Sequence, residues 1–310
     1  MEIAIVGAGA LGAVMGGLLH EANLNPTLLE RNPQEVDFIT THGLWIEGVS
    51  GDRFVQPKIL LSDSALIQAD IVLVLVKSYD TKAAVETVSR ILRDDGLVLT
   101  LQNGIGNFEI LEKAFPGRVL LGTTTIGALA LGLGRVRHTG FGQTHLGEID
   151  GSIRERTVRV ARVLEAMNAG PVHLVENAVG CVWSKLIINA AINAAATLLR
   201  VRNGDLADSD AGRILIHEIV EECRTIVRAK GIRLIFDDPE EQVLAVCRGT
   251  AGNLNSMFQD MRAGRRTEID FINGALAREG DALGVPAPVN KTLTLLIKAM
   301  EATREKTVTH

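Results

Sequence analysis

Residues 1–12 read MEIAIVGAGALG, and this stretch decides how the first half of the chain folds. Four apolar residues, Ile3 to Val6, lead directly into the pattern GxGxxG, and a helical stretch follows. A strand, a glycine loop and a helix in this order open the βαβ unit of dinucleotide-binding folds. The predicted cofactor loop consists of Gly7, Ala8, Gly9, Ala10, Leu11 and Gly12. We expect its backbone and the helix N-terminus to bind a pyrophosphate.

Beyond this loop, short apolar runs alternate with helical stretches as far as about residue 175. The expected strands are Ile3–Val6, Thr27–Glu30, Ile71–Val76, Leu97–Leu101 and Val119–Thr124. Such alternation is typical of a parallel sheet with helices on both faces. After an apolar, glycine-rich loop at 127–134, the segments Arg135–His138 and Thr144–Glu148 are expected to form an antiparallel pair that closes the sheet.

From about residue 177 the pattern changes to long helical periods. The expected helices cover 178–199, 209–230, 239–248, 253–263, 266–283 and 289–305. Gly231 stands where a helix C-cap is expected. The sequence therefore predicts an α/β protein with an N-terminal Rossmann doubly wound sheet, residues 1–175, and an all-α C-terminal domain, residues 176–310.

The composition excludes several classes of protein. The 310 residues carry a net charge of -5 without a long basic run, so we expect no nucleic-acid partner. Three separated cysteines predict neither a disulfide framework nor a metal site. We expect the N-terminal residues to form a strand and not a signal peptide, and the longest apolar stretch, 186–199, contains two asparagines. We expect a cytoplasmic protein without a membrane partner; its oligomeric state is left open, with a homodimer as one option.

Polar residues at the ends of the predicted strands are candidate cofactor contacts. At the end of the second strand, Glu30 would bind a ribose 2′-hydroxyl, whereas Arg31 would pair with a 2′-phosphate. Arg31 followed by Asn32 favours NADPH, and the adjacent acid leaves NADH as an alternative. Lys77 and Asn103 follow later strands at the edge where ligands of open α/β sheets bind. A solvent-exposed loop charge for Lys77 and a turn role for Asn103 remain open.

The stretch WSKLIINAAIN, residues 183–193, is the most informative part of the second half. Lys185, Asn189 and Asn193 recur every four residues, which places them on one side of a helix over about 12 Å. The rest of this helix is apolar, so an ammonium within it is costly unless it meets a partner or ligand. Burial also lowers a lysine pKa towards the range useful for proton transfer. We interpret Lys185 as a general acid; a structural ion pair is the alternative.

A second group of polar residues lies around an expected turn at Gly264. Ser256 is expected in the first turn of one helix and Glu268 in the first turn of the next, with Asn253 nearby. A hydroxyl, helix-terminal amides and a carboxylate can bind a small polar anion. For Glu268 alone, a helix-capping role is the alternative.

These motifs together resemble the ketopantoate reductase (2-dehydropantoate 2-reductase) family over essentially the whole chain. The resemblance rests on five motifs: the GxGxxG loop, NGxG at 103–106, WxKLxxNxxxN at 183–193, Asn203-Gly204, and SMxQD at 256–260 with RxTEIDxING at 265–274. It implies reduction of 2-dehydropantoate, a small 2-oxo acid, to (R)-pantoate with NADPH, on the route to pantothenate and coenzyme A.

The resemblance also implies roles for individual residues. Lys185 would donate the proton, and Glu268 would contact the cofactor ribose or the reacting hydroxyl. The implied substrate contacts are Asn103, Lys185, Asn189, Asn193, Asn203, Asn253 and Ser256. The implied cofactor contacts are Gly7 to Gly12, Arg31, Lys77, Asn103, Ala128 and Glu268. Two alternatives stay open: a related reductase of another small 2-oxo acid, and a non-catalytic protein that senses NADP.

Overall fold

The computed structural model describes residues 1–304 and divides them into two compact units. Unit 1 contains residues 1–102 and 107–178, and unit 2 contains residues 103–106 together with the chain from Val179 onward. The four residues Asn103–Gly106 therefore belong with the helical half. The sequence pattern, which changes near residue 177, did not indicate that a segment of the first half joins the second. Each unit has its own apolar core.

The main sheet of unit 1 is built from strands separated by helices. Its strands are β1 (Ile3–Val6), β2 (Thr27–Glu30), β5 (Lys58–Leu61), β6 (Ala69–Val74), β7 (Leu92–Thr100), β8 (Val119–Thr124), β11 (Thr144–Gly147) and β12 (Val172–Leu174). Within residues 1–304 they form one eight-stranded sheet in the order β12-β11-β8-β7-β6-β1-β2-β5. The neighbouring strands β8, β7, β6, β1, β2 and β5 all run parallel, whereas β11 pairs antiparallel with β8. The chain winds outward from β1 in both directions, which confirms the predicted doubly wound sheet.

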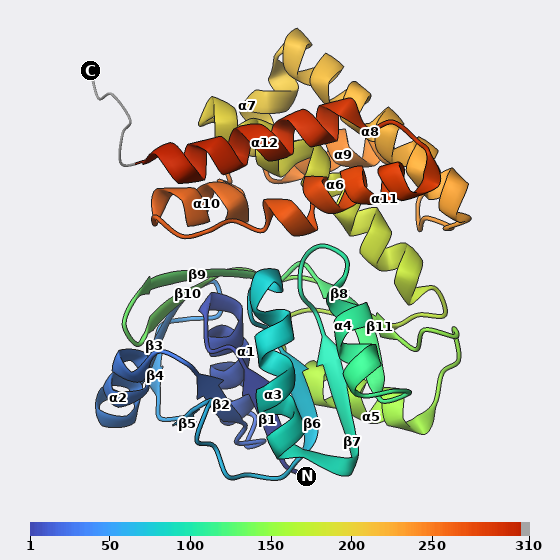
Figure 1. The fold of residues 1–310 in the computed structure, drawn as a ribbon. Coiled ribbons are helices and arrows are strands. Elements are labelled where there is room, and N and C mark those ends of the chain that lie inside the picture. The colour runs from blue at the N-terminus through green and yellow to red at the C-terminus, as the bar shows by residue number, and fades with distance from the viewer. Residues whose placement is uncertain (305–310) are drawn as a thin grey trace. The chain divides into compact units, whose positions relative to one another are not determined.

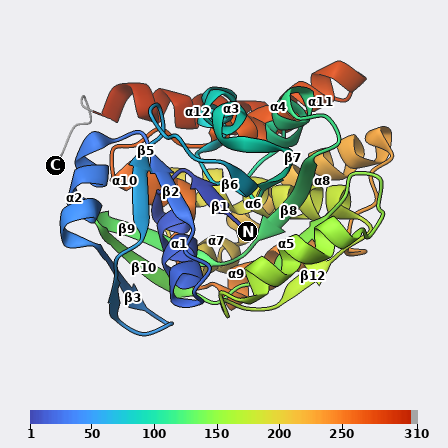
Figure 2. The same ribbon diagram turned by 90° about the horizontal axis from the view of Figure 1, so that it is seen from below.

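Alternation along the strands divides the apolar side chains between the two faces of this sheet. The helices of unit 1 are α1 (Ala10–Glu21), α2 (Pro33–His42), α3 (Thr81–Ile91), α4 (Asn107–Ala114) and α5 (Glu155–Glu165). Ile3 and Ile5 pack in the core that includes α1 and α5, whereas Ala4 and Val6 pack in the core that includes α3 and α4. Figures 1 and 2 show these helix pairs on opposite faces of the sheet.

A second, smaller sheet corrects the prediction for residues 127–148. Its strands are β3 (Leu44–Gly48), β4 (Arg53–Val55), β9 (Gly127–Gly132) and β10 (Arg135–Gly140), in the order β4-β3-β10-β9 within the described residues. Arg135–His138 therefore pairs with β9 and β3, while β11 joins the main sheet. The expected antiparallel pair was wrong, and so was the expected loop at 127–134, most of which is strand β9.

Close packing against α1 accounts for the second sheet. Gly17 lies on the face of α1 towards β3, and an added Cβ there would stand 2.2 Å from Ile46 Cδ1. Ile46 is fully buried and Val136 of β10 is 4% exposed, so these strands bury apolar surface that α1 offers. Burial of this kind stabilises strands that local periodicity alone does not reveal.

Unit 2 consists of helices packed around one central helix. They are α6 (Ala178–Leu199), α7 (Asn203–Asp208), α8 (Asp210–Lys230), α9 (Pro239–Gly249), α10 (Ser256–Arg262), the 3-10 helix η2 (Ile269–Phe271), α11 (Asn273–Leu283) and α12 (Pro288–Thr303). The middle of α6 is almost fully buried. Gly231 adopts φ +67° after α8, which confirms the predicted C-cap. The predicted all-α second half is confirmed.

Some predicted helix ends were wrong for local reasons. The helix expected from 253 begins at Ser256, because the Asn255 side chain accepts a hydrogen bond from Phe258 N and caps it. The helix expected over 266–283 begins only at Asn273, after η2, so Glu268 precedes a 3-10 turn and does not lie in the first turn of an α-helix. The short helix α7 was missed. The predicted last residue of the final helix, 305, lies outside the described residues.

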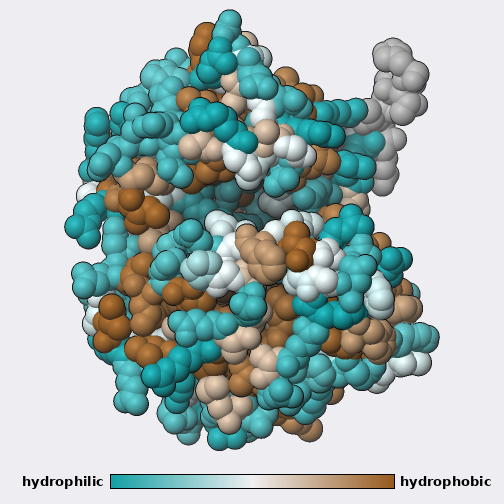
Figure 3. Space-filling model, turned by 180° about the vertical axis from the view of Figure 1, so that it is seen from behind, coloured by the Kyte–Doolittle hydropathy of each residue, from teal (hydrophilic) through white to brown (hydrophobic). Residues whose placement is uncertain are grey.

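Among residues 1–304, one helix, α6, is long and apolar enough to cross a membrane. Most of its apolar window, 72%, is buried inside the protein, as in the core helix of a globular domain. On the face shown in Figure 3, patches of apolar residues are separated by hydrophilic ones. The apolar character of α6 is therefore accounted for by packing within the helical unit.

Candidate active site

The glycine loop of unit 1 has the geometry that close approach of a phosphate requires. Gly7 adopts φ +101°, and an added Cβ would stand 2.7 Å from Val76 N; at Gly12 it would stand 2.0 Å from Gly7 O. Gly9 differs, because an added Cβ would meet nothing within 4 Å. Gly7 and Gly12 are thus required by the fold, whereas Gly9 keeps open space beside the N-terminus of α1. The loop fits a dinucleotide pyrophosphate.

The end of β2 places Glu30 against this loop. Its Oε2 accepts a hydrogen bond from Ala8 N at 3.1 Å. Its Oε1 accepts from Arg31 N at 2.8 Å and from Asn32 N at 3.1 Å. Three backbone amides therefore hold this carboxylate in place. Arg31 points to a different partner, because its Nη2 lies 2.5 Å from Asp80 Oδ2.

A buried polar network supports the segment that follows β6. Gln102 Nε2 donates to Val76 O at 2.8 Å and to Thr81 Oγ1 at 2.7 Å. Thr81 Oγ1 in turn donates to Asn107 Oδ1 at 2.7 Å. Lys77 stands at the N-cap of the 3-10 helix η1 (Ser78–Asp80), directly after Val76. These bonds hold the Val76 carbonyl before Lys77 and the Thr81 side chain after it, at the carboxyl end of the parallel strands.

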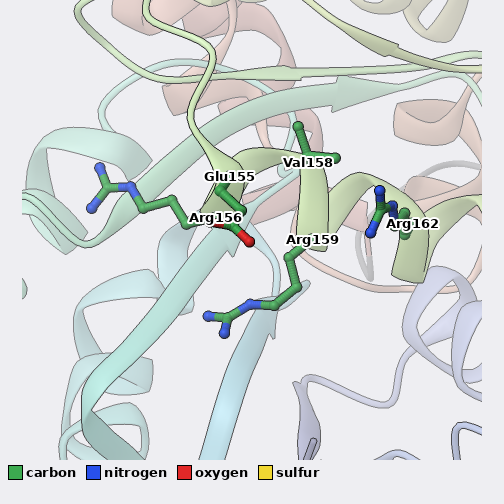
Figure 4. A pocket seen from close by; sticks show the side chains of 5 residues that line it. All are labelled: Glu155, Arg156, Val158, Arg159 and Arg162. Atoms are coloured by element: carbon green, nitrogen blue, oxygen red, sulfur yellow. The ribbon is translucent and has the colours of Figure 1, made fainter.

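Ala128, the remaining predicted cofactor contact, lies in β9 opposite His138 and packs against the core that contains α1. A surface pocket elsewhere in unit 1 involves none of the predicted site residues. It is lined by Glu155, Arg156, Val158, Arg159 and Arg162 of α5 (Figure 4). Arg156 forms an ion pair there with the buried Glu148 carboxylate.

In unit 2, one continuous helix carries the predicted proton donor and two predicted substrate contacts. Lys185 and Asn189 are half-buried on α6, and Asn193 is 5% exposed. Burial lowers the pKa of Lys185 from 10.5 to about 8, and the charge of Glu268 opposes this effect by raising the pKa. An ammonium with a pKa near 8 is charged at neutral pH and can give up its proton readily, as a general acid requires.

Glu268 and Asn103 are brought together by the chain segment that unit 2 takes from the first half. Asn103 Nδ2 donates to Glu268 Oε2 at 3.4 Å, although 165 positions separate them. Ile105 N donates to Phe271 O at 3.1 Å, next to η2. Gly104 adopts φ +80°, and an added Cβ would stand 2.3 Å from Phe271 O. The predicted residues Lys185, Glu268 and Asn103 thus belong to one unit. Within it, the charge of Glu268 raises the pKa of Lys185.

The other predicted substrate residues lie around α7 and α10. Asn203 is 7% exposed, and its Nδ2 donates to Thr250 Oγ1 at 2.9 Å. Asn203 N donates to Asn253 O at 3.1 Å, which holds α7 against the segment before α10. The side chains of Asn253 and Ser256 are exposed. Asn203 therefore links α7 to the segment between α9 and α10. Asn253 and Ser256 are accessible to solvent.

Sequence reasoning missed Asn255 and Thr197. Thr197 Oγ1 donates to Asn255 Oδ1 at 3.3 Å, and both residues are buried. Asn255 Nδ2 is buried without a hydrogen-bond partner among the described residues. Thr197 continues the four-residue spacing of Lys185, Asn189 and Asn193, and this periodicity could have indicated it.

Comparisons with known proteins match both parts of the chain. The family described as "Ketopantoate reductase PanE/ApbA" matches residues 3–151, and its C-terminal counterpart matches residues 177–301. The 2-dehydropantoate 2-reductase of Pyrococcus horikoshii is 37% identical, and that of Archaeoglobus fulgidus 35%; each alignment covers 97% of this chain and 98% of the relative.

Solved structures give the same result. A PanE/ApbA family ketopantoate reductase from Ralstonia eutropha has a TM-score of 0.90 at 33% identity and covers 98% of this chain and all of its own. A D-mandelate dehydrogenase bound to NADH and anilino(oxo)acetate has a TM-score of 0.91 at 27% identity, with 98% and 99% covered. In sequence and in fold, over nearly its whole length, this chain belongs to the ketopantoate reductase family.

Proposed function

We propose that the protein reduces 2-dehydropantoate to (R)-pantoate with NADPH in the cytoplasm, a step on the route to pantothenate and coenzyme A. The observation that carries the proposal is Lys185, a half-buried lysine beside the charge of Glu268 whose pKa is lowered to about 8. The names of the relatives support the substrate. NADH remains the alternative cofactor, because Glu30 lies at the position that favours a free ribose 2′-hydroxyl.

Each unit would supply one part of the reaction. Gly7 to Gly12, Arg31, Lys77 and Ala128 would hold the dinucleotide, with Asn103 and Glu268 of unit 2 as further contacts. The bound nicotinamide supplies the hydride. Lys185 would stabilise the negative charge that develops on the carbonyl oxygen and pass its proton to that oxygen. The substrate contacts would be Asn103, Asn189, Asn193, Asn203, Asn253 and Ser256.

A related reductase of another small 2-oxo acid is the second candidate, which the likeness to D-mandelate dehydrogenase favours. The test follows the absorbance of NADPH and NADH with 2-dehydropantoate and, separately, with an aryl 2-oxo acid. We expect turnover with 2-dehydropantoate. Turnover with the aryl acid alone would favour the second candidate, and binding of cofactor without any turnover would indicate a sensor.

The Glu268→Gln variant should shift the pH dependence of the reaction. Reduction requires the Lys185 ammonium, so kcat should fall as the pH rises through about 8. Because the Glu268 charge raises the pKa of Lys185, its removal should move this midpoint to lower pH. The measurement is kcat against pH for both proteins, with Glu240→Gln on α9 as the control. An unchanged or higher midpoint in Glu268→Gln would contradict the coupling of the two groups.

A further inference from the structure

Glu30 and Arg31 stand at the end of β2, and Asp80 of η1 contacts Arg31 there. These charges have opposite effects on the binding of a 2′-phosphate. Glu30 is held by three backbone amides, including Ala8 N of the glycine loop. A carboxylate fixed in this way accepts a hydrogen bond from a ribose hydroxyl and repels a phosphate. Arg31 is the cation that could offset this repulsion, since a guanidinium pairs well with phosphate oxygens.

Arg31 is already paired, and its partner is Asp80. The Nη2–Oδ2 distance is 2.5 Å, with 52% of the Arg31 side chain and 26% of the Asp80 side chain exposed. A phosphate that used Arg31 would have to share the guanidinium with Asp80 or displace it. Asp80 lies at the N-cap of α3, but its side chain makes no capping hydrogen bond there. The Asp80 carboxylate thus contacts Arg31, the residue that follows β2, through this ion pair and does not cap α3.

We propose that Asp80 is a specificity-determining residue that narrows the preference for NADPH over NADH by holding Arg31. The inference rests on the proposed function, because it concerns the dinucleotide that this function uses. The fixed carboxylate of Glu30 and the pairing of Arg31 with Asp80 both disfavour a 2′-phosphate at the end of β2. The protein therefore accepts NADH as well as NADPH, and release of Arg31 from Asp80 favours NADPH.

The test measures binding, so it does not depend on turnover. Dissociation constants for NADPH and for NADH are determined by calorimetry for the unsubstituted protein, Asp80→Asn, Arg31→Ala and the double variant. Asp80→Asn should bind NADPH at least about threefold more tightly, the scale of a partly exposed ion pair, with NADH binding unchanged. The gain should shrink at high salt, because exposed charges are screened. It should vanish in the double variant, because Asp80 acts through Arg31.

Asp95→Asn is the matched control, since it removes one acid near the amino end of β7, and it should change neither constant. A loss of NADPH affinity in Asp80→Asn would overturn the inference, because Asp80 would then be orienting Arg31 for the phosphate. Equal changes for both dinucleotides would overturn it as well. If the unsubstituted protein binds neither dinucleotide, the proposed function fails together with the inference; if it binds both and Asp80→Asn leaves their ratio unchanged, only the inference fails.

Discussion

Replacement of Lys185 by alanine should lower kcat for the reduction at least about 100-fold, the usual scale for loss of a general acid. Among the described residues of unit 2, Lys185 is the lysine whose pKa is lowered, to about 8, so that it is charged at neutral pH and still able to give up its proton. Affinity for the dinucleotide should change little, because the glycine loop that would bind it belongs to unit 1. The measurement is steady-state kcat for both proteins, together with calorimetric binding of the dinucleotide.

Two further variants separate chemistry from folding. Lys185→Met keeps much of the side-chain volume and removes a charge that burial disfavours, so its melting temperature should be equal or higher. Lys185→Arg keeps a cation that does not give up its proton, so it should remain slow. Lys291→Ala on the exposed side of α12 is the control and should be fully active. Near-normal turnover in Lys185→Ala would refute the assignment.

Replacement of Gly9 by alanine should weaken binding of both NADPH and NADH at least about tenfold without lowering the melting temperature. An added Cβ meets nothing within 4 Å, and the φ of Gly9, -65°, is ordinary for any residue, so the fold tolerates the methyl group. The space that it fills is the one through which a pyrophosphate would approach the backbone. Tenfold corresponds to about 1.4 kcal/mol of binding free energy.

The nearby Gly12→Ala variant, unlike Gly9→Ala, should lose stability. Its Cβ would stand 2.0 Å from Gly7 O, so the loop itself must shift and the melting temperature should fall. Gly249→Ala, at the end of α9, also meets open space and serves as the control that leaves binding unchanged. Unaltered affinity in Gly9→Ala would show that no ligand approaches this part of the loop.

Local sequence was sufficient for features that depend on local chemistry. The glycine loop, the strands before it and after it, and the long helix α6 follow from periodicity and from glycine geometry. The C-cap at Gly231 follows from the same reasoning. The roles proposed for Lys185 and Glu268 also began from residue types, and they stay predictions until the variants above are measured.

Features that depend on distant pairing could not be read from the sequence. Strand β3 pairs with β10 some ninety positions away, as Glu47 and Arg137 illustrate. No local pattern indicates such a partner, and the glycines of β9 suggested a loop. The link between Asn103 and Glu268 is equally remote. Asn255 is a further example, because its contact with Thr197 joins residues that lie 58 positions apart in the sequence.

The four residues Asn103–Gly106 have a consequence for any attempt to divide this protein. The backbone passes from one unit to the other three times, after residues 102, 106 and 178. A fragment that started at Val179 would lose the donor Ile105 N and leave Phe271 O without it, beside the segment that carries Glu268. A helical half produced alone would thus lack part of its own interior. Cutting the gene after residue 178 would leave the helical fragment without four residues of its unit, whereas a graft that carried the NGIG tetrapeptide along would keep them.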